Sequence, residues 1–229
     1  MLKSNGEPCS RCAGRARCLI GRQGDAFGTA MASRVTERAF QKGEVLLGEG
    51  QLPTVIQVVK VGMVMLTRRG EDGVSRPIGL SGWGQPVGST AVLGLAAPMS
   101  CVAVTAGRCC QVEMASLQAA GLLDMEFMSE VARDFVRTSA RVADWARVVR
   151  IKGLTGQLAG TLLQISRMQG SNLIRLPSHT TLASLLATTR ETIARALRQL
   201  ELQHCLLRHD RWHCEVLPEP LCRWIESTG

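Results

Sequence analysis

Residues 182–200 read LASLLATTRETIARALRQL, which has the layout of two short helices joined by a tight turn. Small or apolar residues stand where two crossing helices must pack against each other, at Ala183, Ile193, Leu197 and Leu200. Thr189 can cap the second helix, because its hydroxyl can accept a hydrogen bond from an unpaired backbone N–H in the first turn. The stretch therefore predicts a helix-turn-helix, with Ala187 at a turn position where glycine is usual.

The N-terminal end of the second helix carries residues suited to reading DNA, namely Arg190, Glu191, Ala194 and Arg195. An arginine can donate two hydrogen bonds to O6 and N7 of guanine, and a glutamate can accept one from N4 of cytosine. Helices of this kind present their N-terminal end to base edges in the major groove. Arg198 lies one turn further along and is placed to meet a phosphate. We predict regulatory DNA binding; the alternative is a solvated helix face that merely carries these charges.

The flanking segments complete a winged module. A helix is predicted over residues 156–168 and a short strand over residues 173–176. After the second helix, residues 205–217 (CLLRHDRWHCEVL) indicate a β-hairpin that turns near Asp210 and Arg211. Three cysteines of this module are expected to be buried small apolar side chains: Cys205, Cys214 and Cys222.

Residues 40–114 have the character of an all-β domain. Short apolar runs such as VIQVVKVG and MVMLT are separated by turn-forming stretches such as RRGEDG and SGWGQP. Apolar runs of strand length that are punctuated by Gly, Pro and Asp predict a barrel or a roll.

Residues 115–152 are predicted to be helical, and apolar residues recur there at alternating spacings of three and four. These seam residues are Met128, Val131, Phe135, Thr138, Val142, Trp145 and Val149, with one polar member. Because the seam is narrow and outlasts a typical globular helix, we predict that it forms a homodimer interface. The alternative is a helix that packs on its own domain.

The first thirty residues are rich in Gly and Arg and are expected to be irregular. Cys9, Cys12 and Cys18 have the spacing C-x2-C-x5-C, which suits three sulfurs that reach one metal centre. In a reducing cytoplasm, cysteines indicate metal ligation, redox chemistry or buried side chains rather than disulfides. Three arginines between the cysteines are expected to lower the pKa values of the thiols: Arg11, Arg15 and Arg17.

The composition sets further bounds on the function. The net charge of +8 fits an anionic partner, most simply nucleic acid. No apolar run approaches the roughly 18 to 20 residues of a membrane span, and the N-terminus lacks the apolar region of a secretory signal. We expect a soluble, cytoplasmic chain with no membrane partner. Because no phosphate loop or catalytic triad is recognisable, we expect neither catalytic residues nor enzyme activity.

The run RETIAR, followed by L-x-x-L-E, resembles the recognition helix of the CRP/FNR superfamily, named after the cyclic-AMP receptor protein and the fumarate–nitrate-reduction regulator. The resemblance extends over residues 42–218. It implies a β-roll sensor, a long dimer helix and a winged helix-turn-helix, with Arg190, Glu191 and Arg195 as base readers. It also implies a homodimer on palindromic DNA, with TGTGA-like half-sites, and RNA polymerase as a partner.

Two signals common in this family fit poorly. Its cyclic-nucleotide sensors use a Gly-Glu-Leu turn and an Arg-Ser-Ala segment, where this chain has GST (residues 88–90) and PMSC (residues 98–101). Without the Glu and the Arg, a buried phosphodiester would be poorly held, so cyclic AMP is not expected. Haem is weakly supported, because all four histidines lie in the predicted DNA-binding module.

The cysteine triad is similar to that of the FNR subgroup, which holds an oxygen-labile [4Fe–4S] cluster. The subgroup takes its fourth ligand just before the dimer helix, where Cys110 matches; Cys109 is the adjacent alternative and Cys101 a distant third. Four thiolates satisfy such a cluster. A Zn(Cys)4 site, a disulfide switch and a haem or small-molecule sensor stay open at this point, as does an iron–sulfur electron carrier.

We therefore expect an α+β protein that regulates transcription in response to oxygen or redox state, through a [4Fe–4S] cluster on Cys9, Cys12, Cys18 and Cys110. The expected parts are an N-terminal arm (1–30), a β-roll sensor (31–120), a dimerisation helix (121–152) and a winged helix-turn-helix domain (153–229).

Overall fold

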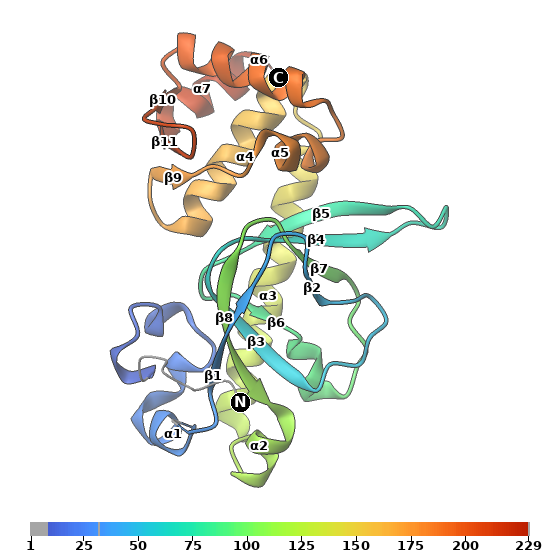
Figure 1. Cartoon of the computed structure of the whole chain (residues 1–229), viewed down its shortest axis with the longest axis vertical. Helices are drawn as coiled ribbons and strands as arrows, with labels where there is room; N and C mark the ends of the chain where they lie inside the picture. Colours follow the sequence, from blue (N-terminus) through green and yellow to red (C-terminus); the bar gives the residue numbers. More distant parts are fainter. Residues whose placement is uncertain (1–8, 32, 229) are drawn as a thin grey trace. The chain divides into compact units, whose positions relative to one another are not determined.

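The computed structural model describes residues 9–31 and 33–228 (Figure 1). The chain divides into two compact units, the first ending at Ala140 and the second beginning at Arg141. The first unit contains a β-roll with helices, and the second contains a winged helix-turn-helix. The predicted α+β fold class is confirmed.

The N-terminal segment is more ordered than its sequence suggests. Three 3-10 turns, η1 (Cys9–Arg11), η2 (Arg15–Arg17) and η3 (Gly21–Gln23), lead into helix α1 (Gly24–Met31). The expectation of an irregular arm is thus wrong for residues 9–31, while residues 1–8 lie outside the described part. Four apolar side chains of the segment are buried, namely Leu19, Ile20, Phe27 and Met31. Their burial stabilises the segment through ordinary hydrophobic packing.

Two four-stranded antiparallel sheets form the roll, as the all-β prediction requires. The first sheet has the order β1-β8-β3-β6 and the second the order β2-β7-β4-β5. The strands are β1 (Thr36–Phe40), β2 (Val45–Leu47), β3 (Val55–Val61), β4 (Val64–Arg69), β5 (Ser75–Ser81), β6 (Pro86–Val87), β7 (Ser100–Ala103) and β8 (Gly107–Glu113). A 3-10 turn, η4 (Ser89–Leu93), follows β6.

The two faces of the first sheet serve two different cores. Side chains alternate between the faces along a strand, so neighbouring residues point to opposite sides. Val59 and Cys109 join the core inside the roll, together with Phe40 and Val64. Ile56, Val58 and Val112 instead join an outer core with residues of the N-terminal segment and the helices. Phe27 stacks on Phe127, with ring centroids 5.7 Å apart, and this contact joins α1 to helix α3 (Met125–Val148).

The predicted helical stretch of residues 115–152 is interrupted. Helix α2 (Met114–Ala119) ends before Gly121, which has a φ of +65°, and helix α3 (Met125–Val148) begins after Asp124. A carboxylate oxygen of Asp124 accepts a hydrogen bond from the backbone N–H of Phe127 at 2.8 Å, which satisfies a donor in the first turn of α3.

The second unit holds helices α4 (Leu154–Gln169), α5 (His179–Leu185), α6 (Arg190–Leu202) and α7 (Pro218–Thr228). Its three strands, β9 (Leu173–Arg175), β10 (Leu206–Arg208) and β11 (His213–Val216), pair antiparallel in the order β10-β11-β9. The predicted wing hairpin is therefore present. Cys205 and Cys214 are buried as expected, but Cys222 is exposed on α7, which corrects that prediction. Among the described helices, none combines the length and apolar character needed to cross a membrane.

Candidate functional site: a DNA-reading helix and a cysteine cluster

Helix α6 begins and packs as its sequence predicts. The hydroxyl of Thr189 accepts a hydrogen bond from the backbone N–H of Thr192 at 3.2 Å, so Thr189 is the N-cap. The predicted packing residues are all buried, namely Ala183, Ile193, Leu197 and Leu200. The turn before α6 contains Ala187, whose φ of +49° lies in the left-handed region that favours glycine. This conformation explains why glycine is usual at that position.

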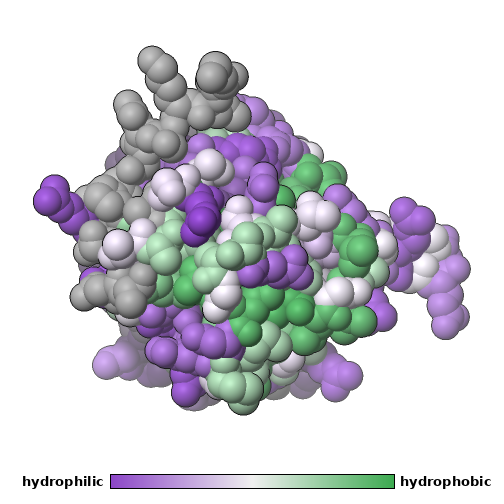
Figure 2. Space-filling view, turned by 90° about the horizontal axis from the view of Figure 1, so that it is seen from below, coloured by the Kyte–Doolittle hydropathy of each residue, from purple (hydrophilic) through white to green (hydrophobic). Residues whose placement is uncertain are grey.

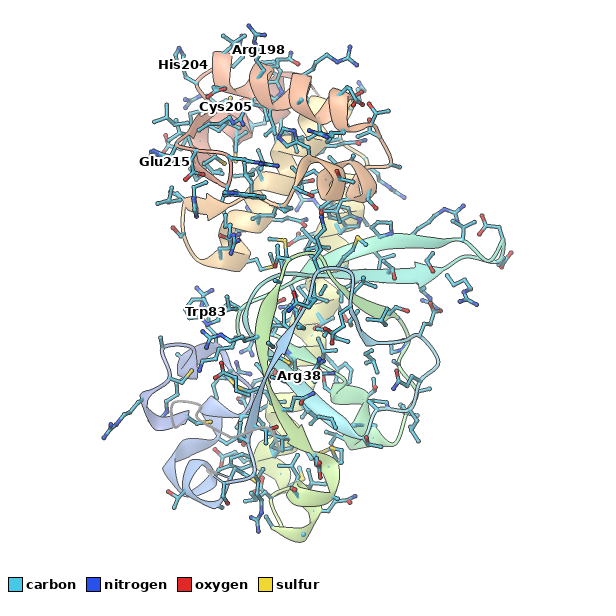
Figure 3. All side chains as sticks on the ribbon, in the orientation of Figure 1. Arg38, Trp83, Arg198, His204, Cys205 and Glu215 are labelled. Carbon is cyan, nitrogen blue, oxygen red and sulfur yellow. The ribbon has the colours of Figure 1, made fainter. Side chains whose placement is uncertain are left out.

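The five residues predicted to contact DNA share the exposed side of α6: Arg190, Glu191, Ala194, Arg195 and Arg198. They are exposed because the opposite side of the helix is anchored by Ile193 and Leu197. Figure 3 shows Arg198 projecting from α6. Arg195 is partly oriented by its own helix, since its Nη2 donates a hydrogen bond to Oγ1 of Thr192 at 3.2 Å. Their contacts with bases and phosphates remain predictions.

A cavity of about 260 Å³ lies between the N-terminus of α5, the start of α6 and the wing. Its lining consists of Leu176, Pro177, Ser178, His179, Thr180, Arg190, Arg208, Arg211 and Trp212. Apart from Arg190, the sequence analysis assigned none of these residues to a site. Burial lowers the pKa of His179, and the charges of Arg208, Arg190 and Arg211 lower it further. The cavity therefore favours an anion.

The wing turn has its own polar support. Asp210 accepts hydrogen bonds from the backbone N–H groups of Trp212 and His213, at 2.5 and 2.8 Å. Its bond with the His213 side chain, together with these backbone bonds, lowers the pKa of Asp210 to about 2. The guanidinium of Arg211 lies 4.9 Å from the ring centroid of Trp212. Asp210 is thus engaged with the turn, and it is not among the residues that line the cavity.

The cysteines of the N-terminal segment are brought together by successive turns. Backbone N–H groups of Cys12 and Arg15 donate to the carbonyls of Cys9 and Cys12, at 3.3 and 3.0 Å. The N–H of Cys18 donates to the carbonyl of Gly14 at 3.0 Å. Cys9 and Cys18 are half-buried against the outer core of the first unit. All three thiols are free.

Strand alternation separates the three candidates for a fourth thiol. Cys109 is fully buried in the core inside the roll, where its Sγ lies 3.4 Å from Oε1 of Gln57. Cys101 belongs to the same inner core. Cys110 is half-buried and points to the outer face, opposite Glu37 and Val58 in the neighbouring strands. That face is the one which the N-terminal segment covers.

Electrostatic coupling places Cys110 beside the N-terminal thiols. Burial, together with the neighbouring Cys18 and Cys9, raises the pKa of Cys110 to about 12. Burial likewise raises the pKa values of Cys9 and Cys18, with Cys12 contributing in both cases. The expected lowering of these pKa values by interleaved arginines is thus outweighed: burial dominates, and Arg15 contributes only weakly at Cys9.

A group of three charged residues borders the thiols, in which Lys60 and Glu37 are partly buried and Arg108 is exposed. Nζ of Lys60 lies 2.8 Å from Oε2 of Glu37, and Nη1 of Arg108 lies 2.7 Å from Oε1 of the same carboxylate. The hydrogen bond from Lys60 and the charges of both cations lower the pKa of Glu37. Lys60 also opposes the rise in the pKa values of Cys9 and Cys110. This corner of the site therefore has a cation that can offset thiolate charge.

The cysteine-bearing segment docks closely on the turn between β5 and β6. The guanidinium of Arg17 lies 4.8 Å from the ring centroid of Trp83, which Figure 3 shows beside this segment. A Cβ on Gly14 would lie 2.8 Å from Nε1 of Trp83, and a Cβ on Gly84 would lie 2.6 Å from Cβ of Arg17. Glycine is therefore required at both positions for this approach.

The fit of the thiols to a metal depends on the kind of centre. Within residues 9–31 and 33–228, no three or more His, Cys, Asp or Glu side chains are grouped so that they could hold a metal ion. A single Zn²⁺ needs its sulfurs about 2.3 Å from one point. A [4Fe–4S] cluster takes four cysteine thiolates, one for each iron, and so needs them less converged. Cys9, Cys12, Cys18 and Cys110 are all half-buried, and the kind of centre that they would hold stays a prediction.

The predicted seam of α3 does not share one free face. Val131 and Trp145 are buried within the chain, and Phe135 packs against the outer core. Met128 and Val142 are partly exposed, and Val149, just beyond α3, is exposed. A different set of residues, including Met125 and Val136, is exposed on α3. Dimerisation of this helix stays a prediction, but packing within the chain accounts for part of the seam.

Comparisons with known proteins agree with this architecture. A family model described as a cyclic nucleotide-binding domain matches residues 37–121, and one described as a Crp-like helix-turn-helix domain matches residues 156–218. No curated protein sequence matches the chain.

Several solved structures share the fold. FixK2 from Bradyrhizobium japonicum is 21% identical, with a TM-score of 0.69 over 82% of this chain and 96% of its own. TTHB099, a transcriptional regulator of the CRP family from Thermus thermophilus, is 20% identical, with a TM-score of 0.62 over 83% and 97%. CLP, a c-di-GMP-responsive global regulator from Xanthomonas campestris, is 15% identical, with a TM-score of 0.60 over 82% and 97%. At these identities the likeness extends to the fold alone.

Proposed function

This chain is a DNA-binding transcription regulator of the CRP/FNR family, and from that premise we propose that it senses oxygen or redox state through a [4Fe–4S] cluster. The proposed ligands are Cys9, Cys12, Cys18 and Cys110. The carrying observation is that Cys110 points to the sheet face covered by the N-terminal segment and interacts electrostatically with Cys18 and Cys9, whereas Cys109 and Cys101 point into the roll.

The chain's own residues supply a protected site for such a centre. When bound, a [4Fe–4S] cluster supplies iron–thiolate bonds that oxidants can attack. The raised pKa of Cys110 keeps its thiol protonated near neutral pH, so metal binding there must displace a proton. Lys60 offsets part of the thiolate charge, and the contact of Arg17 with Trp83 holds the segment against the roll.

DNA recognition in this proposal combines two surfaces of the second unit. Exposed residues of α6, led by Arg190, Glu191 and Arg195, read base edges in the major groove. The cavity beside them takes a backbone phosphate, because Arg208 and Arg211 face it and its described lining includes no carboxylate. Phosphate contacts of this kind fix the orientation of α6 on the duplex.

We place the homodimer contact on the exposed stripe of α3. This stripe consists of Met125, Ser129, Ala132, Val136 and Ser139, which recur at spacings of four and three. Met125 and Val136 are 80% and 70% exposed, the two highest fractions among the exposed large apolar side chains of the described residues. Figure 2 shows that apolar side chains also run together over part of one face of the chain, as is typical of interaction surfaces. A dimer presents two α6 helices to a palindrome about one DNA turn apart.

Anaerobic purification tests the sensor directly. The expected product is a coloured protein with close to four iron and four sulfide per chain, whose specific DNA binding falls on exposure to air. A colourless protein that contains only zinc would refute the cluster, as would a disulfide between Cys110 and the N-terminal segment in the working form.

A substitution in the exposed stripe of α3 tests the dimer. Val136→Asp should give a monomer by light scattering, whereas Val74→Asp, at an exposed position in the turn between β4 and β5, should not.

A further inference from the structure

One arginine of the N-terminal segment is inserted between two carboxylates of α3. Nε of Arg22 donates to Oε2 of Glu130 at 2.6 Å, and its Nη2 donates to both oxygens of Asp134 at 3.1 and 3.2 Å. The side chains are 17%, 11% and 7% exposed, respectively. Burial alone would raise the pKa of Glu130, but hydrogen bonds from Arg22 and Arg133 lower it, so the carboxylate is held in its charged form.

The same arginine is fixed to the loop that carries Cys18. Its backbone N–H donates to the carbonyl of Cys18 at 3.0 Å, and its Nη1 donates to the carbonyl of Arg17 at 2.8 Å. The Arg22 guanidinium is therefore hydrogen-bonded on two sides. Its Nη1 donates to the cysteine-bearing loop, and its Nε and Nη2 donate to α3. A displacement of the loop must move the guanidinium.

The remaining cations near these carboxylates cannot replace Arg22. Arg133 pairs with Glu130, and Arg137 lies 3.0 Å from Oδ1 of Asp134, each from one turn further along the same helix. Both of these arginines are largely exposed. Solvent screens the exposed arginine of each pair, so these pairs compensate the buried carboxylates less than Arg22 does, and removing the buried partner of a buried carboxylate is costly. Without Arg22, this stretch of α3 would carry two poorly compensated buried charges.

We propose that Arg22 is a positioning residue that couples the ordering of the cysteine-bearing loop to α3; the regulatory meaning of this coupling rests on the proposed function. When the loop is seated, Arg22 neutralises Glu130 and Asp134 and holds residues 130–134 against the first unit. When the loop leaves, the two carboxylates must reach solvent, and α3 loosens or turns at that stretch. Ala132 and Val136 lie on the other side of the same turns, so the proposed dimer stripe moves with it.

Hydrogen exchange on the cluster-free full chain tests the coupling without any metal. Arg22→Gln should speed amide exchange over residues 128–138 by about tenfold or more. The matched control is Arg133→Gln, which removes an exposed arginine from the same Glu130 and should change exchange in that window by less than about threefold. Equal exchange in the two variants would overturn the proposal.

Two further variants separate charge coupling from simple loss of packing. Arg22→Lys keeps the charge but cannot donate to both carboxylates in the same way, and it should give intermediate exchange. The triple variant Arg22→Gln, Glu130→Gln, Asp134→Asn removes the stranded charges and should recover most of the protection. Failure of this rescue would show that Arg22 acts only by filling space.

The regulatory part is tested on protein prepared without oxygen. Arg22→Gln should keep its iron and sulfide, but its dimer fraction should no longer change when the cluster is lost. A variant that dimerises on cluster loading as the unmodified chain does would refute the regulatory role. If the unmodified chain binds no iron, the proposed function fails, while the exchange comparison still decides the coupling.

Discussion

The two candidate sites of this protein are assembled in opposite ways. The residues that we propose to read DNA lie within nine consecutive positions of one helix, and a local cap and local core contacts orient that helix. The thiol site draws on Cys9–Cys18, on β3 and β8 of the roll and, through Arg22, on α3. A local site survives as long as its helix forms, whereas the thiol site exists only while distant segments stay docked. The second kind of construction suits the sensor that we propose, because such a site must come apart on a signal.

The largest effect on the thiol site is expected from removing the one thiol that lies far from the others in the sequence, that of Cys110. Cys110→Ala should abolish cluster binding, because the outer face of the sheet then offers no fourth sulfur. The matched variant Cys109→Ala alters the adjacent residue in the inner core, and it should retain iron while losing some stability. Iron and sulfide analysis of anaerobically purified protein decides the matter. Retention of the cluster by Cys110→Ala would mean that the site is assembled differently.

Substitutions in α6 should instead lower the affinity for DNA in smaller, separate steps. Arg190→Ala should reduce affinity for a specific half-site by about 10- to 100-fold and relax the preference at one base pair. Arg198→Ala should weaken binding to all sequences alike and lower the slope of affinity against salt by about one unit. Fluorescence anisotropy at several salt concentrations separates the two effects. Sequence-independent loss in Arg190→Ala would place that residue on a phosphate.

The pH dependence of DNA binding tests whether the cavity beside α6 binds a phosphate. Burial and three arginines lower the pKa of His179 in the free protein, and a bound phosphate would raise it. DNA binding should therefore take up a proton, so affinity should rise as the pH falls from about 7 through the lowered pKa. His179→Gln should remove most of this slope, and His204→Gln should not. A pH-independent affinity in the unmodified protein would argue against phosphate in the cavity.

The smallest effect concerns the turn of the helix-turn-helix. Ala187 has a positive φ, so Ala187→Gly should raise the free energy of unfolding of the second unit by about 0.5–1 kcal/mol. Ala183→Gly, at a buried position inside α5, should lower it by about 1 kcal/mol or more, because it loses a buried methyl group as well as helix propensity. Thermal unfolding followed by circular dichroism measures both. Equal destabilisation by both substitutions would mean that the turn is not strained.

Residues in sequence-local patterns were predicted well, and the reason is physical. Thr189, Ile193 and Leu197 act within one or two helical turns, so the spacing of side chains already carries the interaction. The interpretation of residues 9–31 as irregular failed because no long periodic pattern marks α1, although Phe27 and Met31 are buried. Likewise, Arg22 has no local signal, since its partners lie more than one hundred residues away.

The seam of α3 shows how one pattern can support two interpretations. An apolar repeat of three and four residues indicates a buried helix face but does not say what covers it. Within the chain, Val131 and Phe135 are covered by the outer core, while Val136 on another face is left exposed. Only the fold distinguishes the face that packs internally from the face that is available to a partner.

The amino-acid sequence by itself determined the α+β class, the helix-turn-helix with its capped reading helix, and the set of thiols from which a metal centre could be drawn. These follow from periodicity, capping and residue chemistry, which act over short stretches of chain. The tertiary structure alone decided that Cys110 and not Cys109 faces the N-terminal segment, because strand alternation sends neighbours to opposite faces. It also decided that Arg22 neutralises two carboxylates of α3, since contacts between distant segments exist only once the cores around them have formed.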